Sequence, residues 1–386
     1  MTNNSNTPAI RFKGFTDAWE QRELEEVITV GNGMDYKHLS EGDIPVYGTG
    51  GYMLSVDKAL SYDKDAIGIG RKGTIDKPYI LKAPFWTVDT LFYCIPKEEY
   101  SLDFVYCVFQ NVNWKEKDES TGVPSLSKVN IYSTGVKVPA LAEQEKIGEY
   151  FSKLDSLITL HQRKCDKLIQ FKAAMLRKMF PQNGANKPEI RFKGFTDAWE
   201  QRELSEISDV RDGTHDSPSY LSEGHPFVTS KNVKDGYINY DDIQYISDED
   251  FEAINKRSKV DVNDILMGMI GTIGNLALIR TEPDFAIKNV ALIKDTKQVS
   301  YMYLYHYLQS PNTESQLLSG LDGGTQKFVS LKNIRELHIM VPSEAEQIKV
   351  GTFIESLDNL ITLHQRKCEK YKKIKSGLIR KLFPIK

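Results

Sequence analysis

Hydrophobic positions recur at helical spacing over two long stretches of the chain. From Ile147 to Met179, mostly apolar residues follow one another at alternating intervals of four and three, and the same pattern returns from Val350 to Leu382. This spacing is typical of the seam of a coiled coil. Pro139 and Pro181 enclose the first stretch and mark its limits. The pattern therefore predicts two long helices of matched length.

Two such helices in one chain can bury their seams by packing on each other, and we expect an antiparallel pair. His161 and His364 interrupt the seams; without an acidic residue or second histidine at ligand spacing, they fit a register-fixing role better than a metal site or pH switch. No metal site is predicted. The expected seam consists of Ile147, Phe151, Leu154, Ile158, His161, Cys165, Val350, Ile354, Leu357, Ile361, His364 and Cys368.

The regions outside these helices contain short runs of alternating or β-branched residues. Such runs, separated by Gly, Pro, Asn and Asp, fill residues 25–137 and 205–340, and helical spacing is clearest at 102–111 and 300–308. The predicted fold class is α+β. We expect two mixed α/β domains held apart by two long antiparallel helices and related by a pseudo-twofold internal repeat.

The chain is a tandem duplication. Residues 10–24 and 190–204 are the same fifteen letters, and Leu157–Cys165 recurs as Leu360–Cys368. Constant flanks around divergent middles indicate a shared scaffold carrying two different recognition domains, although recombination between the halves would also keep the flanks identical. The expected divisions are a first domain (1–140), its scaffold helix (141–182), a linker (183–190), a second domain (191–342) and its helix (343–386).

Composition and charge narrow the possible functions. The 386 residues carry 50 Lys+Arg and 53 Asp+Glu, a net charge of −3. The two globular parts are acidic (15 basic against 19 acidic residues in 1–140, 16 against 23 in 191–342), whereas the helices are basic. Apolar runs are too short for a membrane span, the N-terminus lacks a secretory pattern, and four cysteines show no C-x-x-C spacing. A cytoplasmic protein without membrane contact is expected.

Several loops carry side chains suited to DNA. The divergent region 25–137 contains Gly70–Ile75 (GRKGTI), and the divergent region 205–340 contains Gly268–Ile273 (GMIGTI). Only the first of these two loops carries cationic residues. Arginine suits a guanine edge, Asn and Gln suit adenine, and Lys holds phosphates. A solvated hairpin turn is the alternative. The candidate DNA-binding residues are Arg71, Lys72, Thr74, Lys128, Asn130, Thr214, His215, Lys231, Asn232, Thr272, Lys288, Asn289, Thr325, Gln326 and Lys327.

Motifs for catalysis are missing from the sequence. There is no Gly-Lys dipeptide of a phosphate-binding loop, no H-E-x-x-H and no G-x-S-x-G. Catalytic residues are therefore not predicted.

Several of these features together resemble one known family, the specificity subunits of type I restriction and modification systems. The features are the repeated segments around Trp19 and Trp199, the DGTHDSP stretch at 212–218, and the loops GRKGTI and GMIGTI, called here the Gly-Thr loops. The run SLSKVNIYSTGVKVPALAEQEKIGEYFSKLDSLI, which leads into the first long helix, is a further feature. The resemblance covers nearly the whole chain.

The resemblance implies a non-catalytic subunit whose two domains each read half of a split, asymmetric sequence in double-stranded DNA, with the helices setting the spacer. It implies two docked modification subunits that use S-adenosylmethionine, and restriction subunits that use ATP; this chain itself would hold no cofactor. The alternatives are a specificity subunit of a type IIB-like methyltransferase-nuclease, a coiled-coil adaptor without a DNA role, and a self-sufficient enzyme, which the missing motifs disfavour.

Overall fold

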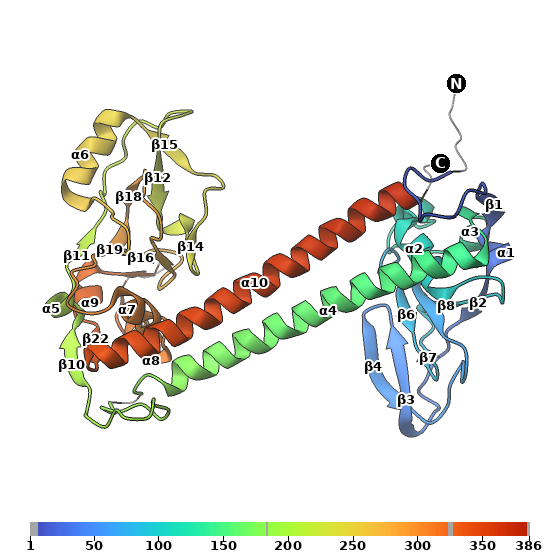
Figure 1. Cartoon of the computed structure of the whole chain (residues 1–386), viewed down its shortest axis with the longest axis horizontal. Coiled ribbons are helices and arrows are strands. Elements are labelled where there is room, and N and C mark those ends of the chain that lie inside the picture. Colours follow the sequence, from blue (N-terminus) through green and yellow to red (C-terminus); the bar gives the residue numbers. More distant parts are fainter. Residues whose placement is uncertain (1–6, 183, 323–326, 384–386) are drawn as a thin grey trace. The chain divides into compact units, whose positions relative to one another are not determined.

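The computed structural model describes residues 7–182, 184–322 and 327–383. The chain divides into two compact units, one formed by residues 1–162 with 365–386 and the other by residues 163–364. Each unit therefore combines a globular part with the beginning of one long helix and the end of the other (Figure 1). The fold is α+β. The limits of the recognition domains that the sequence predicts remain a prediction.

Unit 1 contains a four-stranded antiparallel sheet in the order β2-β8-β5-β6, a three-stranded sheet β4-β3-β7 and a strand pair β1-β9. Its elements are β1 (Glu20–Glu23), α1 (Leu24–Val27), β2 (Ile28–Asn32), β3 (Glu41–Gly48), β4 (Gly51–Val56), β5 (Ala66–Gly70), β6 (Tyr79–Leu81), β7 (Trp86–Thr87), β8 (Leu91–Pro96), α2 (Leu102–Asn111), the 3₁₀ helix η1 (Trp114–Lys117), α3 (Lys128–Tyr132), β9 (Gly135–Val138) and the first part of α4 (Leu141–Lys178).

Unit 2 contains a four-stranded antiparallel sheet β11-β19-β16-β17, a three-stranded sheet β15-β12-β18 and the pairs β10-β22, β13-β14 and β20-β21. Its elements are β10 (Glu200–Glu203), α5 (Leu204–Ile207), β11 (Val210–Asp212), β12 (His225–Thr229), η2 (Ser230–Asn232), β13 (Val233–Lys234), β14 (Tyr237–Ile238), β15 (Gln244–Ile246), α6 (Asp248–Ser258), β16 (Ile265–Gly268), β17 (Leu276–Leu278), β18 (Ala286–Lys288), β19 (Val290–Ile293), α7 (Tyr301–Leu308), α8 (Pro311–Ser319), β20 (Leu321–Asp322), β21 (Phe328–Val329), α9 (Leu331–Arg335), β22 (His338–Val341) and the first part of α10 (Glu344–Leu382).

The divergent middles share one topology. In unit 1, β3 pairs with β4 antiparallel and with β7 parallel, and in unit 2 β12 pairs with β15 antiparallel and with β18 parallel. In the four-stranded sheets, Gly70 lies opposite Leu91 and Gly268 lies opposite Val290. The two globular parts therefore present different side chains on equivalent backbones.

The Gly-Thr loops have the same backbone in both units because glycines are required at the same two places. A Cβ on Gly70 would lie 2.1 Å from the carbonyl oxygen of Thr74, and one on Gly268 would lie 2.4 Å from that of Thr272. Gly73 and Gly271 both have a positive φ, of 88° and 73°. A residue with a side chain would be strained at all four positions.

The identical flanks fasten each globular part to its own helix. Arg11 donates two hydrogen bonds to the buried carboxylate of Glu143, at 2.7 and 2.6 Å, and Arg191 donates two to Glu346, at 2.7 and 2.8 Å. Such paired contacts fix orientation as well as distance. The sequence repeat is therefore matched by a repeated structural contact.

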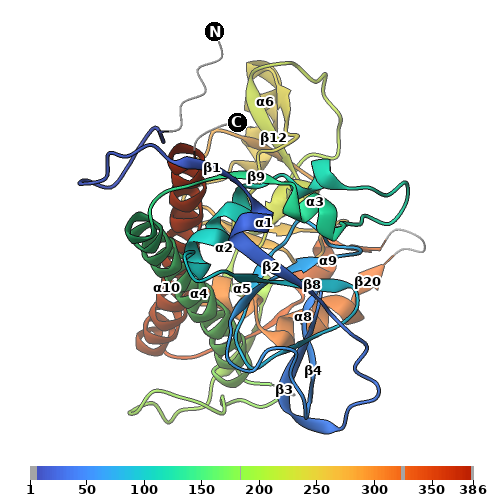
Figure 2. The same cartoon turned by 90° about the vertical axis from the view of Figure 1, so that its right-hand side faces the viewer.

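The long helices pack against each other in antiparallel fashion within each unit. In unit 2, Lys172 of α4 binds both carboxylate oxygens of Asp358 of α10 at 2.7 Å. In unit 1, Lys375 of α10 binds both oxygens of Asp155 of α4 at 2.6 Å, and Figures 1 and 2 show α4 beside α10. The two pairs are separated by equal numbers of residues along both helices, so they impose one common register.

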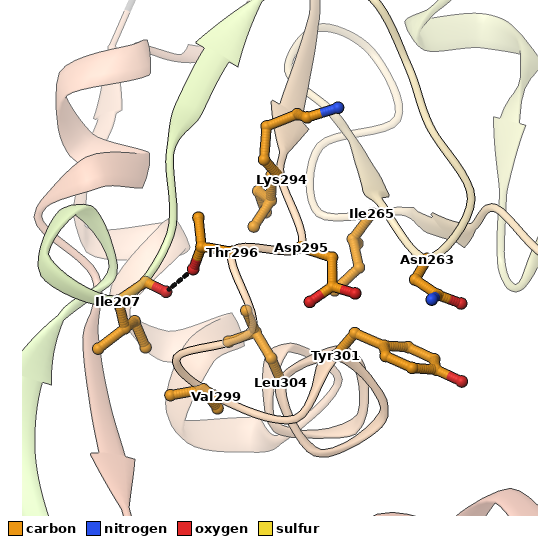
Figure 3. A pocket seen from close by; sticks show the side chains of 10 residues that line it. Ile207, Asn263, Ile265, Lys294, Asp295, Thr296, Val299, Tyr301 and Leu304 are labelled. Carbon is orange, nitrogen blue, oxygen red and sulfur yellow. Dashed lines mark hydrogen bonds between the residues drawn. The ribbon is translucent and has the colours of Figure 1, made fainter.

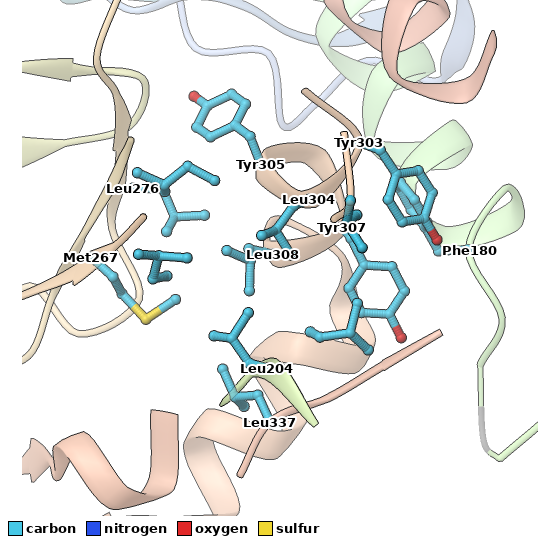
Figure 4. Close-up of a cluster of buried hydrophobic side chains, with 14 of the residues drawn as sticks. Phe180, Leu204, Met267, Leu276, Tyr303, Leu304, Tyr305, Tyr307, Leu308 and Leu337 are labelled. Carbon is cyan, nitrogen blue, oxygen red and sulfur yellow. The ribbon is translucent and has the colours of Figure 1, made fainter. Parts of the chain in front are cut away.

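Seam residues lie in the cores of the units. In unit 1, Ile147, Phe151 and Leu154 belong to a buried cluster that also includes Leu382 and Phe383. The ring of His161 is buried and stacks on Tyr371 with the centroids 5.7 Å apart. In unit 2, the equivalent seam positions Val350, Ile354 and Leu357 belong to a buried cluster. Figure 4 shows other members of this cluster, among them Phe180 and Tyr303.

The start of each repeat meets the end of a long helix through aromatic packing and a backbone hydrogen bond. Trp19 stands 5.9 Å from Phe383, centroid to centroid, and the N–H of Ile10 donates to the carbonyl of Lys381. Correspondingly, the N–H of Ile190 donates to the carbonyl of Lys178, and Trp199 belongs to the core cluster that includes Phe180. The start of each repeat therefore meets the end of a long helix in the same way.

Candidate nucleic-acid interface

The candidate loops of unit 2 converge on Ser230, a residue with only 5% of its surface exposed. Its hydroxyl donates to the carbonyl of Asn289 at 2.5 Å and accepts from the N–H of Met269 at 3.0 Å. Its carbonyl accepts from the hydroxyl of Thr272 at 2.5 Å. Three loops that are far apart in the sequence are thereby joined at one residue, which the sequence analysis did not single out.

Two further loops adjoin this cluster. Thr214 forms a parallel bridge with Lys288, and the N–H of Asn289 donates to the carbonyl of Thr214 at 3.2 Å. Ile270 forms an antiparallel bridge with Phe328. Most of the loops nominated from the second half are therefore neighbours.

Some candidates in unit 2 use their polar atoms to hold the loops themselves. Asn232 is 2% exposed; its amide donates to the carbonyl of Asn239 at 3.0 Å, and its Oδ1 accepts from the N–H of Thr229. The ammonium of Lys288 donates to the hydroxyl of Ser217. Lys231 and Lys327 are exposed. Thr325 and Gln326 lie outside the residues that the structure describes.

In unit 1, the equivalent loop is joined to the segment that follows η1. Lys72 forms a bridge with Ser125, and the N–H of Arg71 donates to the carbonyl of Thr90 at 2.8 Å. Arg71 and Lys72 are exposed, and the guanidinium carbon of Arg71 lies 5.8 Å from the centroid of the Phe92 ring. This geometry leaves Arg71 accessible while supporting its stem.

The other candidates of unit 1 face their own domain. The ammonium of Lys128 donates to the carbonyl of Val30 at 2.8 Å, and the amide of Asn130 donates to the carbonyl of Lys117 at 3.2 Å. The N–H of Asn130 is in addition capped by the hydroxyl of Ser127. Thr74 is half-buried.

Strand register shows which loop positions correspond in the two units. Because Leu91 and Val290 lie opposite equivalent glycines, Thr90 corresponds to Asn289. The N–H of Gly33 donates to the carbonyl of Leu91, and that of Gly213 donates to the carbonyl of Val290. Two residues after these glycines stand Asp35 and His215. Sequence reasoning missed Asp35 and Thr90; the constant offset of 180 residues from the identical flanks was the available signal for Asp35.

A second polar cluster in unit 2 surrounds His306, whose side chain has 0% exposure. Its Nε2 lies 3.4 Å from Glu355, and its Nδ1 lies 3.9 Å from Asp358. Burial lowers the pKa of His306, whereas the interaction with His306 and the nearby Arg280 lowers the pKa of Glu355 to about 2. These three side chains are close enough to hold a metal ion.

The arrangement fits a charge network better than a metal site. A metal ion would need one ring nitrogen and one oxygen from each carboxylate. Both carboxylates already have cationic partners, however: Lys172 binds both oxygens of Asp358, and Arg280 binds Glu355 at 2.8 Å. The two cations balance the two carboxylates when His306 is neutral.

A surface depression near α5 offers no competing ligand site. It encloses about 220 Å³ including open solvent. Figure 3 shows its lining residues, among them Thr296, whose hydroxyl donates to the carbonyl of Ile207 at 2.8 Å. The carboxylate of Asp295 pairs with Lys297. Its polar groups are thus engaged in local structure.

Comparison with known proteins identifies the family. The model of the type I restriction modification DNA specificity domain matches residues 16–170 and 196–373. The chain belongs to this family. Both halves match, in agreement with the duplicated architecture, and the resemblance inferred from the sequence is confirmed.

Relatives and solved structures give the same picture. The chain is 24% identical to the type I restriction enzyme MjaVIII specificity subunit of Methanocaldococcus jannaschii over 69% of this chain and 65% of that protein. It is 21% identical to the MjaIX specificity subunit of the same organism over 94% of this chain and 92% of that protein. The chain is also 26% identical to the putative type I restriction enzyme MjaX specificity subunit of that organism. It covers just under two thirds of the length of the MjaVIII subunit and 45% of the length of the MjaX subunit.

The fold is similar to a solved S subunit of a type I restriction-modification system from M. genitalium. The TM-score is 0.67 at 16% identity, with 98% of this chain and 100% of that chain covered. Of the helices that the structure describes, none is at once long and apolar enough to span a membrane.

Proposed function

We propose that this specificity subunit recognises a bipartite, asymmetric sequence in double-stranded DNA, with each globular part reading one half. The observation that carries the proposal is the pair of equivalent loop frameworks with different side chains at matching positions. Thr90 corresponds to Asn289, and Asp35 corresponds to His215. Equal backbones with unequal donors and acceptors are what two recognition domains for two different half-sites require.

The candidate DNA-binding residues are proposed to make these contacts with different roles. Exposed cations such as Arg71, Lys72 and Lys231 are available for bases or phosphates. Thr272 and Asn232, whose polar atoms are engaged within the loops, are proposed to shape the interface rather than to touch bases. The recognition domains are proposed to occupy residues 1–140 and 191–342.

The scaffold helices, 141–182 and 343–386, are proposed to set the spacer and to dock two modification subunits. Leu157 and Leu160 are exposed on α4, and the identical residues Leu360 and Leu363 are exposed on α10. Large exposed apolar side chains at repeated positions are typical of a surface that a partner covers. Two identical surfaces support two copies of one partner.

Reaction chemistry is proposed to reside in those partners. The modification subunits would use S-adenosylmethionine, and the restriction subunits would use ATP, while this chain would hold neither. Because the target is chromosomal or invading DNA, we place the complex in the cytoplasm. The acidic balance of both recognition domains supports a role for the partners in most of the phosphate contact.

Two other functions make different predictions. A subunit of a type IIB-like methyltransferase-nuclease would recognise DNA equally well, but its partner would combine methylation and cleavage in one polypeptide. A coiled-coil adaptor would bind partner proteins without sequence-dependent protection of DNA. The duplicated loops with divergent polar side chains favour the DNA-reading function over the adaptor.

A domain exchange tests the proposal. The chain is co-expressed with its modification subunit, residues 205–340 are replaced by the corresponding segment of another specificity subunit, and methylated adenines are mapped across the host genome. We expect one half-site to change and the other to stay, since the flanks and both helices are retained. A change in both half-sites, or in neither, would contradict separate recognition domains.

A further inference from the structure

Each Gly-Thr loop is bridged to a later segment of its own unit, and the bridge joins different side chains in the two units. In unit 1 it joins Lys72 to Ser125, and in unit 2 it joins Ile270 to Phe328. Both bridges are antiparallel. One backbone arrangement therefore carries a cationic and a polar side chain in unit 1 and two apolar side chains in unit 2.

A backbone hydrogen bond beside each bridge shows that the positions correspond. The N–H of Leu126 donates to the carbonyl of Arg71 at 2.9 Å, and the N–H of Val329 donates to the carbonyl of Met269 at 3.0 Å. Each bond joins the residue before the bridged position of the loop to the residue after the bridged position of the later segment. The apolar pair of unit 2 thus stands where unit 1 has its polar pair.

The side chains of Ile270 and Phe328, called here the apolar pair, reach the surface of unit 2. Residues directly opposite each other in antiparallel segments project to the same face, so the two side chains lie together. Phe328 is 38% exposed and Ile270 is half-buried. Lys327, which precedes Phe328, is exposed, as is Lys231. The apolar pair is therefore accompanied by cations that are free to hold phosphates.

The backbone of the loop segment that carries Ile270 is engaged within the unit. The N–H groups of Met269 and Ile270 donate to the hydroxyl of Ser230 at 3.0 and 3.4 Å. The carbonyl of Ile270 accepts from the N–H of Thr272 at 2.8 Å, and that of Met269 accepts from Val329. At these two positions only the side chains remain for recognition, and both are apolar.

An apolar side chain makes no hydrogen bond to a base and discriminates among bases by shape alone. In the major groove, thymine is the base that presents an apolar group, its 5-methyl. We propose that the apolar pair of Ile270 and Phe328 packs on the 5-methyl group of a thymine in the half-site read by the second recognition domain. The inference rests on the proposed function of that domain and names the base that one of its loops reads.

Replacing thymine by deoxyuridine tests this contact, because the replacement removes the methyl group and keeps every hydrogen-bonding group of the base. The full chain in complex with its modification subunit is titrated with duplex oligonucleotides in which the thymines of the second half-site, on either strand, are replaced one at a time. Fluorescence anisotropy measures binding. One replacement should weaken binding about fourfold, the effect of one buried methyl group. If no replacement weakens binding, the proposal is overturned.

Variants connect that methyl group to the apolar pair. Phe328→Ala should lower the fourfold ratio between the thymine and deoxyuridine duplexes towards one. Ile270→Lys combined with Phe328→Ser copies the pair that the equivalent backbone of unit 1 carries, so this variant should fold and lose the discrimination entirely. Lys327→Ala is the matched control, since loss of a phosphate contact weakens both duplexes alike and keeps the ratio. A fourfold ratio that survives in the double variant would overturn the proposal.

Two other roles of Phe328 give different results. If its ring were a wedge between base pairs, Phe328→Ala would weaken both duplexes equally and keep the ratio. If it bound the modification subunit, Phe328→Ala would weaken assembly without DNA and keep the ratio. Either result overturns the thymine contact.

Failure of this inference is distinguishable from failure of the function on which it rests. If the exchange of residues 205–340 changes one half-site while no deoxyuridine replacement weakens binding, the thymine contact is wrong and separate recognition domains stand. If the exchange changes neither half-site, the proposed function fails together with the inference.

Discussion

Among single residues, the loops divide their polar side chains between holding the loop and facing outward. Asn232 and Thr272 were candidates because of their chemistry, yet both are engaged within their own domain. Ser230 was not nominated for DNA contacts from its residue type, but it joins three loops through hydrogen bonds to distant segments. Residue type alone could therefore nominate the loops and could not separate these roles, because the separation depends on long-range contacts.

Arg71 is an exposed candidate whose counterpart position in the second Gly-Thr loop is apolar. If it reads guanine, Arg71→Ala should cost about 1–3 kcal/mol and relax one base of one half-site. Methylome mapping of the complex measures this change, and Lys72→Ala serves as the neighbouring-charge control. A uniform loss of affinity with a salt slope smaller by about one would instead assign Arg71 to a phosphate.

The buried His306 makes the stability of unit 2 dependent on pH. Its pKa is lowered by burial, so the unfolded chain binds more protons just below the ordinary value of 6.5. The free energy of unfolding should accordingly fall as the pH drops through this window. The lowered pKa of Glu355, about 2, adds a further loss between 4.5 and 2.

Urea unfolding at pH 7.5 and 5.5 measures the contribution of His306. We expect His306→Gln to reduce the difference in unfolding free energy between the two pH values. An equal pH difference in the wild type and in His306→Gln would contradict the assignment.

Among the structural elements, the long helices were the most predictable part of the chain. The first long helix, expected between Pro139 and Pro181, is observed as Leu141–Lys178, because a sustained heptad pattern and flanking prolines mark both its length and its ends. The sheets were less predictable. Residues 287–293 are one continuous β-like run in the sequence, yet the structure divides them between β18 and β19, since Asn289 turns the backbone between the two strands.

Paired lysine and aspartate residues make the helix register testable. Inserting seven residues into α4 alone, after Cys165, would lengthen the distance between Asp155 and Lys172 but not that between Asp358 and Lys375. Both ion pairs could then no longer form at once, and the complex should lose stability. A matching heptad after His364 of α10 restores both pairs and the seam. The double insertion adds about 10 Å of helix, and if the helices set the spacer, methylome mapping should show it longer by up to about three base pairs.

Unaltered half-sites are the control in that experiment. The insertions lie outside the recognition loops, so base preferences should be the same in the wild type and in the double insertion. An active complex with unchanged spacing would contradict the proposal that these helices act as a ruler.

For the whole molecule, the sequence repeat predicted the fold class and the two recognition domains, and the family match confirms the former. What the repeat could not show is that each compact unit is assembled from both halves of the chain. The reason is physical. The end of α10 contributes Phe383 to the core that contains Trp19, and the segment after α4 contributes Phe180 to the core that contains Trp199. Identical flanks alone do not reveal which helix end each one meets.

The matching contacts of Ile10 with Lys381 and of Ile190 with Lys178 have a topological consequence, for the same junction between a helix end and the start of a repeat occurs twice. One of these contacts is bridged by the continuous polypeptide, while the other brings the two terminal segments together. A circularly permuted chain, joined from residue 381 to residue 10 by a copy of residues 179–189 and opened between Gly184 and Ala185, should therefore fold and direct methylation to the same half-sites. Equal thermal unfolding and an identical methylome would verify this, and failure to fold would contradict it.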